Sequence, residues 1–405
     1  MTCPTKIELL ADQILQNISG LCAWRRRFLV RLFVLWPALL GRHNFINLGR
    51  QGEYGEYTYR KHYAKSFKWL EFNSQLVRAH LGKNCIIAID PTYIPKSGKK
   101  TAGVGYYHSG CAGRSLWGLE MTGLAAVDLD SKIALHLDGV QTVEKSEDEP
   151  LLQYYGEILS CRAEKLQSIS KTVVADAYFS RKPFIAEVMK AGFTLVSRLR
   201  SDVHLRYYYQ GEQKPKGRPR KYAGKVNLKD PELSVFSLVN SLSSSDTRVY
   251  EGGVELKAAA IPIKAVLIQK LDAEGVVKSV KVYMSTDTAM SADFIIHAYR
   301  CRYQQEFLFR DAKQYSGLSE GQARDWKKID FHFNTAMTVV NLAKVAHHLS
   351  IPERQREAFS MADVCTAYAN ERLALRIFEG CGIDPHLPKM QALLGSIRNY
   401  AARAA

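Results

Sequence analysis

The sequence predicts an α/β protein with a mixed β-sheet, interrupted by a β-rich insertion and bounded by helical regions. Between Cys85 and Arg200, apolar runs first follow one another as strands and then alternate with helical segments, a pattern typical of a mixed sheet. The apolar runs that follow are separated only by turn residues, which indicates β-structure without helices. Helical periodicity dominates both ends of the chain. The predicted segments are residues 1–80, 81–200, 201–290, 291–345 and 346–405.

The N-terminal segment, residues 1–80, is predicted to be helical. Its first apolar side chains recur at helical spacing, and arginines among aromatic residues follow between Cys22 and Arg42. Residues 57–81 are rich in Lys, Arg and Tyr. Such a basic module fits a segment that grips DNA ends, and equally fits an ordinary helical subdomain with a basic exterior, because no helix-turn-helix spacing stands out. We keep DNA binding as the working prediction.

The predicted core begins with Cys85–Asp90, a short apolar, β-branched run that ends in an acid. This pattern indicates a buried strand with Asp90 at its C-terminal edge. A loop rich in Gly, Tyr and Lys is predicted from Pro91 to Leu116. The later predictions are strands at 119–130 and 132–143 joined by a turn at Asp128–Ser131, a helix at 147–166 with acids in its first turn, a strand at 171–176 that ends in Asp176, a helix at Arg181–Ala191 and a strand at 193–200.

The β-rich insertion carries a strongly basic stretch, with six cations between Lys214 and Lys225. Its Lys-Gly-Arg-Pro core resembles minor-groove readers of the AT-hook type. A basic loop that contacts phosphates without sequence preference is the alternative that its short length favours. The candidate DNA contacts here are Lys216, Arg218, Arg220 and Lys221. The predicted strands of the insertion lie within residues 206–211, 234–240, 248–252, 255–271 and 277–286.

The composition indicates a globular protein with an anionic partner. Of 405 residues, 46% are apolar, and Lys and Arg outnumber Asp and Glu by 56 to 40, for a net charge of +16. Nucleic acid is the commonest partner of such a chain, and a basic surface without a specific partner is the alternative. The cysteines show no CxxC spacing, which disfavours zinc and favours a reducing cytosol. The apolar run Phe28–Leu40 is too short and too interrupted to span a bilayer, and no cleavable signal precedes it, so we expect a soluble cytoplasmic protein.

One stretch, Ala298–Tyr315, places four polar residues in line. A helix is predicted here because the stretch contains no Pro or Gly. At about 100° per residue, Tyr299, Arg302, Glu306 and Lys313 fall within a stripe about 60° wide. The stripe is either a solvated face with ordinary salt bridges or a site where the carboxylate holds a metal ion and the cations hold phosphate.

Two further acids give this stripe possible partners. Asp90 and Asp176 each follow an apolar run, and the C-terminal ends of strands are where α/β sheets place their sites. Each alone is also an ordinary turn residue at a strand end. If the two strands are neighbours, both side chains can share a cation that Glu306 completes from a crossing helix. Oxygen ligands suit Mg²⁺ or Mn²⁺, and two such ions about 3.5–4 Å apart stabilise an in-line phosphoryl displacement.

The motifs around these acids resemble those of a known enzyme family. The spacing Tyr299-x2-Arg302-x3-Glu306-x6-Lys313 is similar to the Y-R-E-K signature of a group of bacterial insertion-sequence transposases of the DDE type. AIDPTYI around Asp90 and VADAYFS around Asp176 resemble the two Asp motifs of that group. The order Asp, Asp, Glu and the β-rich insertion before the Glu agree with it. The resemblance covers residues 85–345.

This resemblance implies an RNase H-like core, formed by residues 81–200 and 291–345, in a cut-and-paste transposase. It implies that the enzyme acts as a homodimer in a synaptic complex on double-stranded DNA: the terminal inverted repeats of its own element and the target. Water would first cleave at the element boundary, and the freed 3′-hydroxyl would then attack target DNA. The resemblance implies Mg²⁺, with Mn²⁺ as substitute, and a nucleoid-associated protein. It assigns Asp90, Asp176 and Glu306 to the metal-binding catalytic triad and Tyr299, Arg302 and Lys313 to phosphates near the cleaved end.

The sequence departs from the family at one point. Members that form a DNA hairpin use a Trp of the insertion to accept a flipped base, and none of the five Trp here lies between residues 201 and 290. Tyrosines are the available stacking residues. Two alternatives to the transposase stay open: a DNA-binding protein of the same fold without chemistry, and a metal-dependent nuclease without strand transfer. The stacking candidates are Tyr207, Tyr208, Tyr209, Tyr250 and Tyr283.

Overall fold

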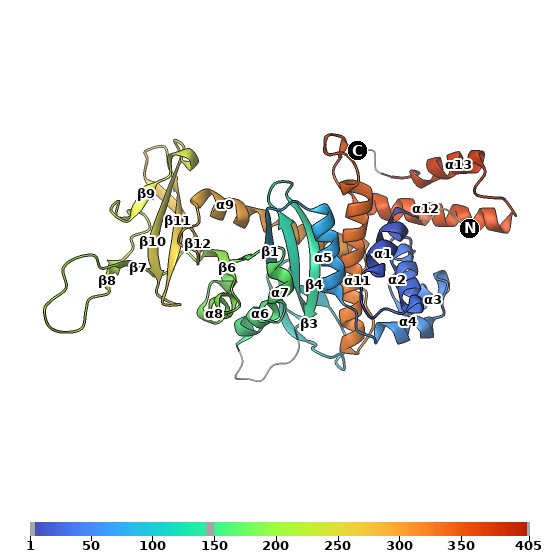
Figure 1. Cartoon of the computed structure of the whole chain (residues 1–405), viewed down its shortest axis with the longest axis horizontal. Coiled ribbons are helices and arrows are strands. Elements are labelled where there is room, and N and C mark those ends of the chain that lie inside the picture. The colour runs from blue at the N-terminus through green and yellow to red at the C-terminus, as the bar shows by residue number, and fades with distance from the viewer. Residues whose placement is uncertain (1–4, 143–149, 403–405) are drawn as a thin grey trace.

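The computed structural model describes residues 5–142 and 150–402. The helices of both chain ends gather at one end of the molecule, a mixed sheet lies in the middle, and the β-rich insertion extends at the other end (Figure 1). The predicted mixed α/β architecture with flanking helices is confirmed. Within these described residues, no helix is long and apolar enough to cross a membrane.

The N-terminal part is helical from Lys6 to His80, as predicted. The side chain of Thr5 caps the first helix by accepting a hydrogen bond from the backbone of Glu8. The second helix buries a run of large apolar side chains that includes Phe28 and Phe33. The helices are α1 (Lys6–Gln16), α2 (Ala23–Leu35), α3 (Phe45–Gln51), α4 (Glu56–Tyr63) and α5 (Trp69–His80).

The central part of the sheet has the order β4-β3-β1-β5-β6. Its first three strands form an antiparallel meander, and β1, β5 and β6 are parallel to one another. The predicted turn at Asp128–Ser131 joins β3 to β4. The strands are β1 (Cys85–Pro95), β3 (Arg114–Asp128), β4 (Ile133–Gln141), β5 (Thr172–Ala175) and β6 (Thr194–Leu199), and a short β2 (Gly105–Ser109) pairs with the start of β3.

Two predictions for this region are wrong. Strand β1 does not end at Asp90 but continues to Pro95, and the predicted loop from Pro91 to Leu116 contains the end of β1, all of β2 and the start of β3. The reason is that β3 is long enough to pair with β1 through Gly118. On the other side of β1, pairing with β5 is confined to Ile87 and Ala88, so the missing N–H of Pro91 breaks no ladder bond there.

Helices cover both faces of this sheet. One face packs against α5, α10 (Gln304–Tyr315) and α11 (Trp326–Lys344). On the other, α8 (Lys182–Lys190) packs against β6 and against α6 (Leu151–Ser160), from which Tyr155 reaches Glu120 of β3, and the short α7 (Ala163–Gln167) packs against α5 and α6. The helix predicted at 147–166 is divided into α6 and α7, and the acids expected in its first turn lie outside the described residues. The helix predicted at Arg181–Ala191 is confirmed as α8.

The β-rich insertion continues the same sheet, because β12 pairs with β6. The apolar run predicted at 255–271 is divided between β10 and β11 by a turn in which Ala260 has a positive φ of 57°. The basic stretch joins β7 to β8 at the far end of the sheet (Figure 1). The strands are β7 (Leu205–Tyr208), β8 (Tyr222–Lys225), β9 (Phe236–Leu238), β10 (Thr247–Leu256), β11 (Ile261–Leu271) and β12 (Val277–Ser285).

The helix predicted over Ala298–Tyr315 is in fact two helices, α9 (Ala292–Cys301) and α10, so this prediction is wrong in one respect. At the junction, the backbone N–H of Gln305 donates to the carbonyl of Arg302, and that of Glu306 donates to Tyr303, both at 3.0 Å. Both are i→i+3 hydrogen bonds of the 3₁₀ type. They tighten the turn and change the direction of α10 relative to α9. No Pro or Gly marks the junction, so the sequence carries no signal for it.

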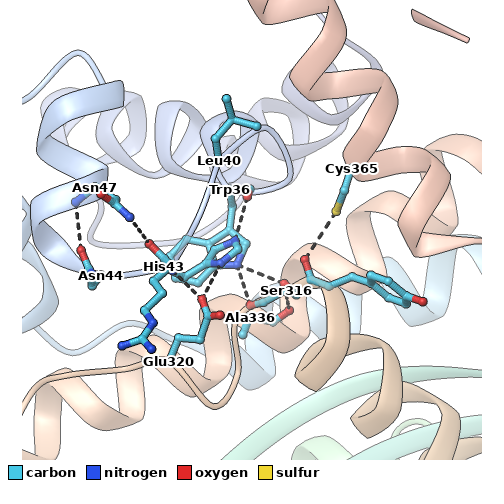
Figure 2. A network of polar contacts seen from close by, with 12 residues as sticks. Trp36, Leu40, His43, Asn44, Asn47, Ser316, Glu320, Ala336 and Cys365 are labelled. Carbon is cyan, nitrogen blue, oxygen red and sulfur yellow. Dashed lines mark hydrogen bonds and ion pairs between the residues drawn. The ribbon is translucent and has the colours of Figure 1, made fainter. Parts of the chain in front are cut away.

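A buried polar network joins the N-terminal helices to the loop after α10 (Figure 2). The indole N–H of Trp36 donates to both the carbonyl and the hydroxyl of Ser316 at 3.0 Å. The backbone N–H of His43 donates to Glu320 at 2.6 Å, and the hydroxyl of Ser316 donates to the carbonyl of Ala336 on α11 at 2.8 Å. The network ties the N-terminal helices to the helices that cover the sheet.

The C-terminal part is helical, as predicted. Its helices are α12 (Met361–Gly380) and α13 (Pro388–Arg398), which follow a single π-turn, η3 (Val345–Leu349), at the end of α11. The hydroxyl of Tyr368 on α12 accepts a hydrogen bond from the backbone of Ile7 on α1 at 3.4 Å. The two ends of the described chain therefore pack against each other.

Candidate active site

Asp90 on β1 and Asp176, the residue directly after β5, lie at corresponding positions along two neighbouring parallel strands. The register pairs Ile87 with Val173 and Ala88 with Val174, so two residues further on it brings Asp90 level with Asp176. Neighbouring strands are about 4.8 Å apart, which places the two carboxylates side by side where β5 ends and β1 continues. Their proximity also appears in electrostatics, because Asp176 raises the pKa of Asp90.

Asp176 is held in place from two sides. Its side chain accepts a hydrogen bond from the backbone N–H of Tyr178 at 2.8 Å and so caps a short 3₁₀ turn, η1 (Ala177–Phe179). The hydroxyl of Ser197 on β6 donates to the carbonyl of Asp176 at 2.8 Å. These bonds fix the chain as it leaves β5.

Helix α10 lies directly on the strand that neighbours Asp90. Gln305 donates a side-chain hydrogen bond to the carbonyl of Gly123 at 2.7 Å, and Gly123 is the residue paired with Asp90. Further along the helix, the ammonium of Lys313 donates to the hydroxyl of Thr92 at 2.7 Å. Glu306, in the first turn of α10, is thereby brought to the edge where the two aspartates lie.

Arg302 lies between two of the three acids. Its Nη1 is 3.5 Å from Asp90 Oδ2, and its Nη2 donates to Glu306 Oε1 at 2.9 Å. The side chains are 12% exposed for Arg302, 20% for Asp90 and 38% for Glu306, so the guanidinium is the most enclosed of the three. The guanidinium therefore links the acid of the sheet to the acid of the helix.

The pKa shifts of Asp90 and Arg302 reflect several acids that lie close together. Desolvation in this enclosed site raises the pKa of Asp90 to about 7; Arg302 opposes the shift, and Asp176 and Glu306 add to it. Burial lowers the pKa of Arg302, but the neighbouring Asp90, Tyr299 and Glu306 outweigh it, so the net shift is upward. The site thus favours one extra positive charge, which a proton, a guanidinium or a metal ion can supply.

Three residues of the predicted stripe, Tyr299, Arg302 and Lys313, are partly enclosed, and Glu306 is more exposed. Tyr299 is half-buried and stacks edge-on against Tyr283 of β12, with ring centroids 5.0 Å apart. Desolvation raises the pKa of its hydroxyl. Lys313 is also half-buried, and burial lowers the pKa of its ammonium. The four residues therefore do not form a fully solvated helix face.

Two charged residues near the acids were not among the site residues predicted from the sequence. Glu120 on β3 is buried, accepts a hydrogen bond from the hydroxyl of Tyr155 at 2.5 Å and contributes to the raised pKa of Asp90. Arg198 on β6 is exposed, pairs in register with Tyr283 and lowers the pKa of Tyr299 against the effect of burial. Glu120 could have been found from the sequence, because it is an acid within an otherwise apolar strand. Arg198 could not, because it lies in a strand of ordinary alternating pattern.

The predicted basic contacts of the insertion lie away from the acids. They are on the exposed connection between β7 and β8 at the far end of the sheet (Figure 1). Arg220 donates to the carbonyl of Tyr222 at 3.0 Å and lies over the ring of Tyr209, 4.6 Å from its centroid. The other predicted contacts of this segment are Lys216, Arg218 and Lys221, all exposed.

The donor set fits a hard divalent cation, although the acids are not arranged around one. Within residues 5–142 and 150–402, no three His, Cys, Asp or Glu side chains converge closely enough to hold a metal ion. Asp90, Asp176 and Glu306 nevertheless offer the carboxylate oxygens that Mg²⁺ and Mn²⁺ prefer. Desolvation is the main cause of the raised pKa of Asp90, and Asp176 and Glu306 add to it, so a nearby cation would favour the ionised carboxylates. Arg302 stands where a cation would contact both Asp90 and Glu306.

Acids at this edge of a mixed sheet, in the order Asp, Asp, Glu, are the arrangement expected of a DDE-type transposase. The chain belongs to that family: the family model of the transposase DDE domain matches residues 81–342. Enzymes of this family generally use divalent metal ions. No curated protein matches the chain. Among solved structures, the cryo-EM structure of a piggyBac transposase synaptic complex with hairpin DNA is similar at 12% identity and a TM-score of 0.40, covering 96% of this chain and 74% of that chain.

Proposed function

We propose that this transposase cuts the ends of its insertion sequence and joins the freed 3′ ends to target DNA by metal-assisted in-line phosphoryl transfer. One observation carries the proposal: Asp90 on β1 and Asp176 directly after β5 are level, and Glu306 of α10 is linked to Asp90 by Arg302. The intact Y-R-E-K spacing supports membership of the bacterial insertion-sequence group that bears this signature.

The fold we assign to the core is RNase H-like. The strand order β4-β3-β1-β5-β6, with an antiparallel meander followed by parallel strands, supports this assignment. We divide the core between residues 81–200 and 291–345 and treat residues 201–290 as an insertion domain. Residues 1–80 are assigned to DNA binding and residues 346–405 to a helical tail.

In this mechanism Asp90, Asp176 and Glu306 hold Mg²⁺, or Mn²⁺ in its place. The bound ions supply Lewis-acid activation of the phosphate and stabilise charge on the attacking and leaving oxygens. The chain itself positions the DNA. Lys313, fixed by Thr92 beside Asp90, directs an ammonium towards the phosphate at the cleaved end, and Tyr299 borders the same place. Arg302 is assigned to a phosphate of the end DNA.

The DNA partners are the terminal inverted repeats and the target, held by a homodimer that pairs two ends. The net charge of +16 supplies the general attraction to DNA. Arg198, exposed beside Tyr299, and the basic connection between β7 and β8 extend the contact from the acids along the sheet.

The test is a strand-cleavage assay on oligonucleotides from the inverted repeats that flank the reading frame, with Mg²⁺ present. Asp90→Asn, Asp176→Asn and Glu306→Gln are each expected to reduce cleavage to background while binding to the same DNA changes by less than about threefold. Asp293→Asn, at an exposed acid in the first turn of α9, is the matched control and should cleave like the wild type. Cleavage retained by a variant removes that acid from the triad.

The products separate the two rival functions. Joined products, in which the 3′ end of the repeat is linked to target DNA, identify a transposase. Nicked DNA without joined products would identify a nuclease, and binding without any nicking would identify a DNA-binding protein of the same fold.

A further inference from the structure

Arg302 occupies the space between two acids that we assign to metal ions. Its guanidinium contacts Asp90 at 3.5 Å and Glu306 at 2.9 Å, and Asp176 also acts on it electrostatically. Three carboxylates at one edge repel one another, so a chain without metal needs a positive charge among them. Arg302 supplies that charge from within the protein.

One of the hydrogen-bond donors of the Arg302 side chain, the buried Nε, has no partner among the described residues. A buried donor without a partner is unfavourable, which makes this position of the side chain less stable. The same guanidinium cannot bridge Asp90 and Glu306 and also grip a DNA phosphate bidentately, because both tasks use its terminal nitrogens.

The surroundings of Arg302 allow its side chain to move away from the two acids. It is the C-cap residue of α9 at the junction with α10, with its backbone N–H still bonded to the carbonyl of Ala298 at 3.2 Å, and the ring of Tyr299 lies 5.8 Å from its guanidinium carbon. Lys313 differs, since the hydroxyl of Thr92 fixes its ammonium. Of the cations in the stripe, Arg302 is the one whose present contacts are acids assigned to the metal.

We propose that Arg302 is the internal counter-cation of the acid cluster in the DNA-free protein, and that it competes with divalent metal for Asp90 and Glu306 until a phosphate of the end DNA draws it away. This inference rests on the proposed function, because it takes these acids to be metal ligands. By linkage, end DNA then raises metal affinity and metal raises affinity for end DNA by the same factor. This competition weakens metal binding as long as the protein is not bound to its DNA.

The test measures Mn²⁺ binding to the full chain by electron paramagnetic resonance, without and with end DNA. Without DNA, Arg302→Gln should bind Mn²⁺ about tenfold more tightly than the wild type, a coupling within the usual range between linked sites. Arg302→Lys keeps the charge but cannot bridge both acids, so it should fall between the two. Arg310→Gln removes an exposed arginine of α10 that pairs with Asp311, and should bind Mn²⁺ like the wild type.

End DNA should then raise the Mn²⁺ affinity of the wild type about tenfold and leave that of Arg302→Gln nearly unchanged. Mn²⁺ held by DNA alone is subtracted with the Asp90→Asn variant in the same DNA. Circular dichroism melting checks that each variant is folded, and if Arg302→Gln does not fold, Arg302→Lys decides the question.

The outcomes distinguish the inference from the function on which it rests. Equal Mn²⁺ affinity in the wild type and both Arg302 variants, with binding abolished by Asp90→Asn, overturns the counter-cation role and leaves the metal site intact. Mn²⁺ binding that ignores Asp90→Asn in every variant overturns the metal site itself, and with it the proposed function.

Discussion

Gly123 lies directly opposite Asp90 in the antiparallel register of β1 and β3, and its missing side chain gives α10 the space to lie on the sheet beside this acid. A Cβ at this position would lie 2.7 Å from Cζ of Phe309 and 2.9 Å from Cε1, distances that carbon atoms do not tolerate. The carbonyl of the same glycine accepts the hydrogen bond from Gln305. One residue of the sheet therefore sets how closely the helix of Glu306 approaches.

Gly123→Ala is expected to push α10 away from the sheet and to move Glu306 relative to Asp90. Overpacking of this kind costs about 1–3 kcal/mol of folding free energy, and we expect strand cleavage to fall at least about tenfold. Urea unfolding and the cleavage assay measure the two effects. Gly253→Ala on β10, where an added Cβ meets nothing within 4 Å, is the control, and equal losses in both variants would contradict the role of Gly123.

Arg198→Ala should weaken binding to end DNA and reduce the salt dependence of that binding by about one phosphate contact, because the side chain is exposed beside Tyr299. The measurement is the slope of log K against log salt concentration. Arg200→Ala, whose guanidinium already pairs with Asp202 at 3.1 Å, should change the slope less. An unchanged slope in Arg198→Ala would remove this residue from the DNA contact.

Replacing Lys216, Arg218, Arg220 and Lys221 together by Gln should lower the salt slope by up to about four units, since each cation can neutralise one phosphate. All four side chains are exposed, so the melting temperature should not change. If discrimination between A·T-rich and mixed DNA is lost along with affinity, the segment reads the minor groove; if affinity falls equally for both, it contacts phosphates alone.

Trp36→Phe should loosen the joint between the N-terminal helices and the core, because it removes the donor that serves both acceptors of Ser316 (Figure 2). A buried acceptor left without its partner costs about 1–3 kcal/mol. Urea unfolding and amide hydrogen exchange in α2 should report the change. Trp24→Phe, at a tryptophan in the first turn of α2 that is 45% exposed, should have a smaller effect, and the reverse order would count against the network.

Asp330→Asn should make stability less dependent on pH. Desolvation, aided by the neighbouring Asp138, raises the pKa of Asp330 on α11 to about 7. Because the pKa is about 3.9 in the unfolded chain, the stabilisation from this proton is present below about pH 4 and is lost as the pH rises through 7. The variant lacks this titrating group, so its free energy of unfolding should fall less than that of the wild type between pH 5 and pH 8. The difference between the two falls, measured by urea unfolding, should be at least about 1 kcal/mol. Parallel stability curves would contradict the shift.

Local pattern was enough for much of the fold. The apolar runs around Cys85–Asp90 and before Asp176 predicted strands, and the mixed sheet followed from their order. Strand ends and helix breaks were less predictable. Strand β1 runs past Asp90 because β3 is available as a partner, and α9 ends at Cys301 although no Pro or Gly stands there.

The sequence by itself determined the charge of the chain, the order of the three acids and the Y-R-E-K spacing, because these are properties of neighbouring residues and of chain order. Only the tertiary structure decided that Arg302 pairs with Asp90, that Gly123 admits α10, and that Glu120 and Arg198 lie at the site. These contacts join residues far apart in the chain, and strand register and helix packing, which no local pattern encodes, bring them together.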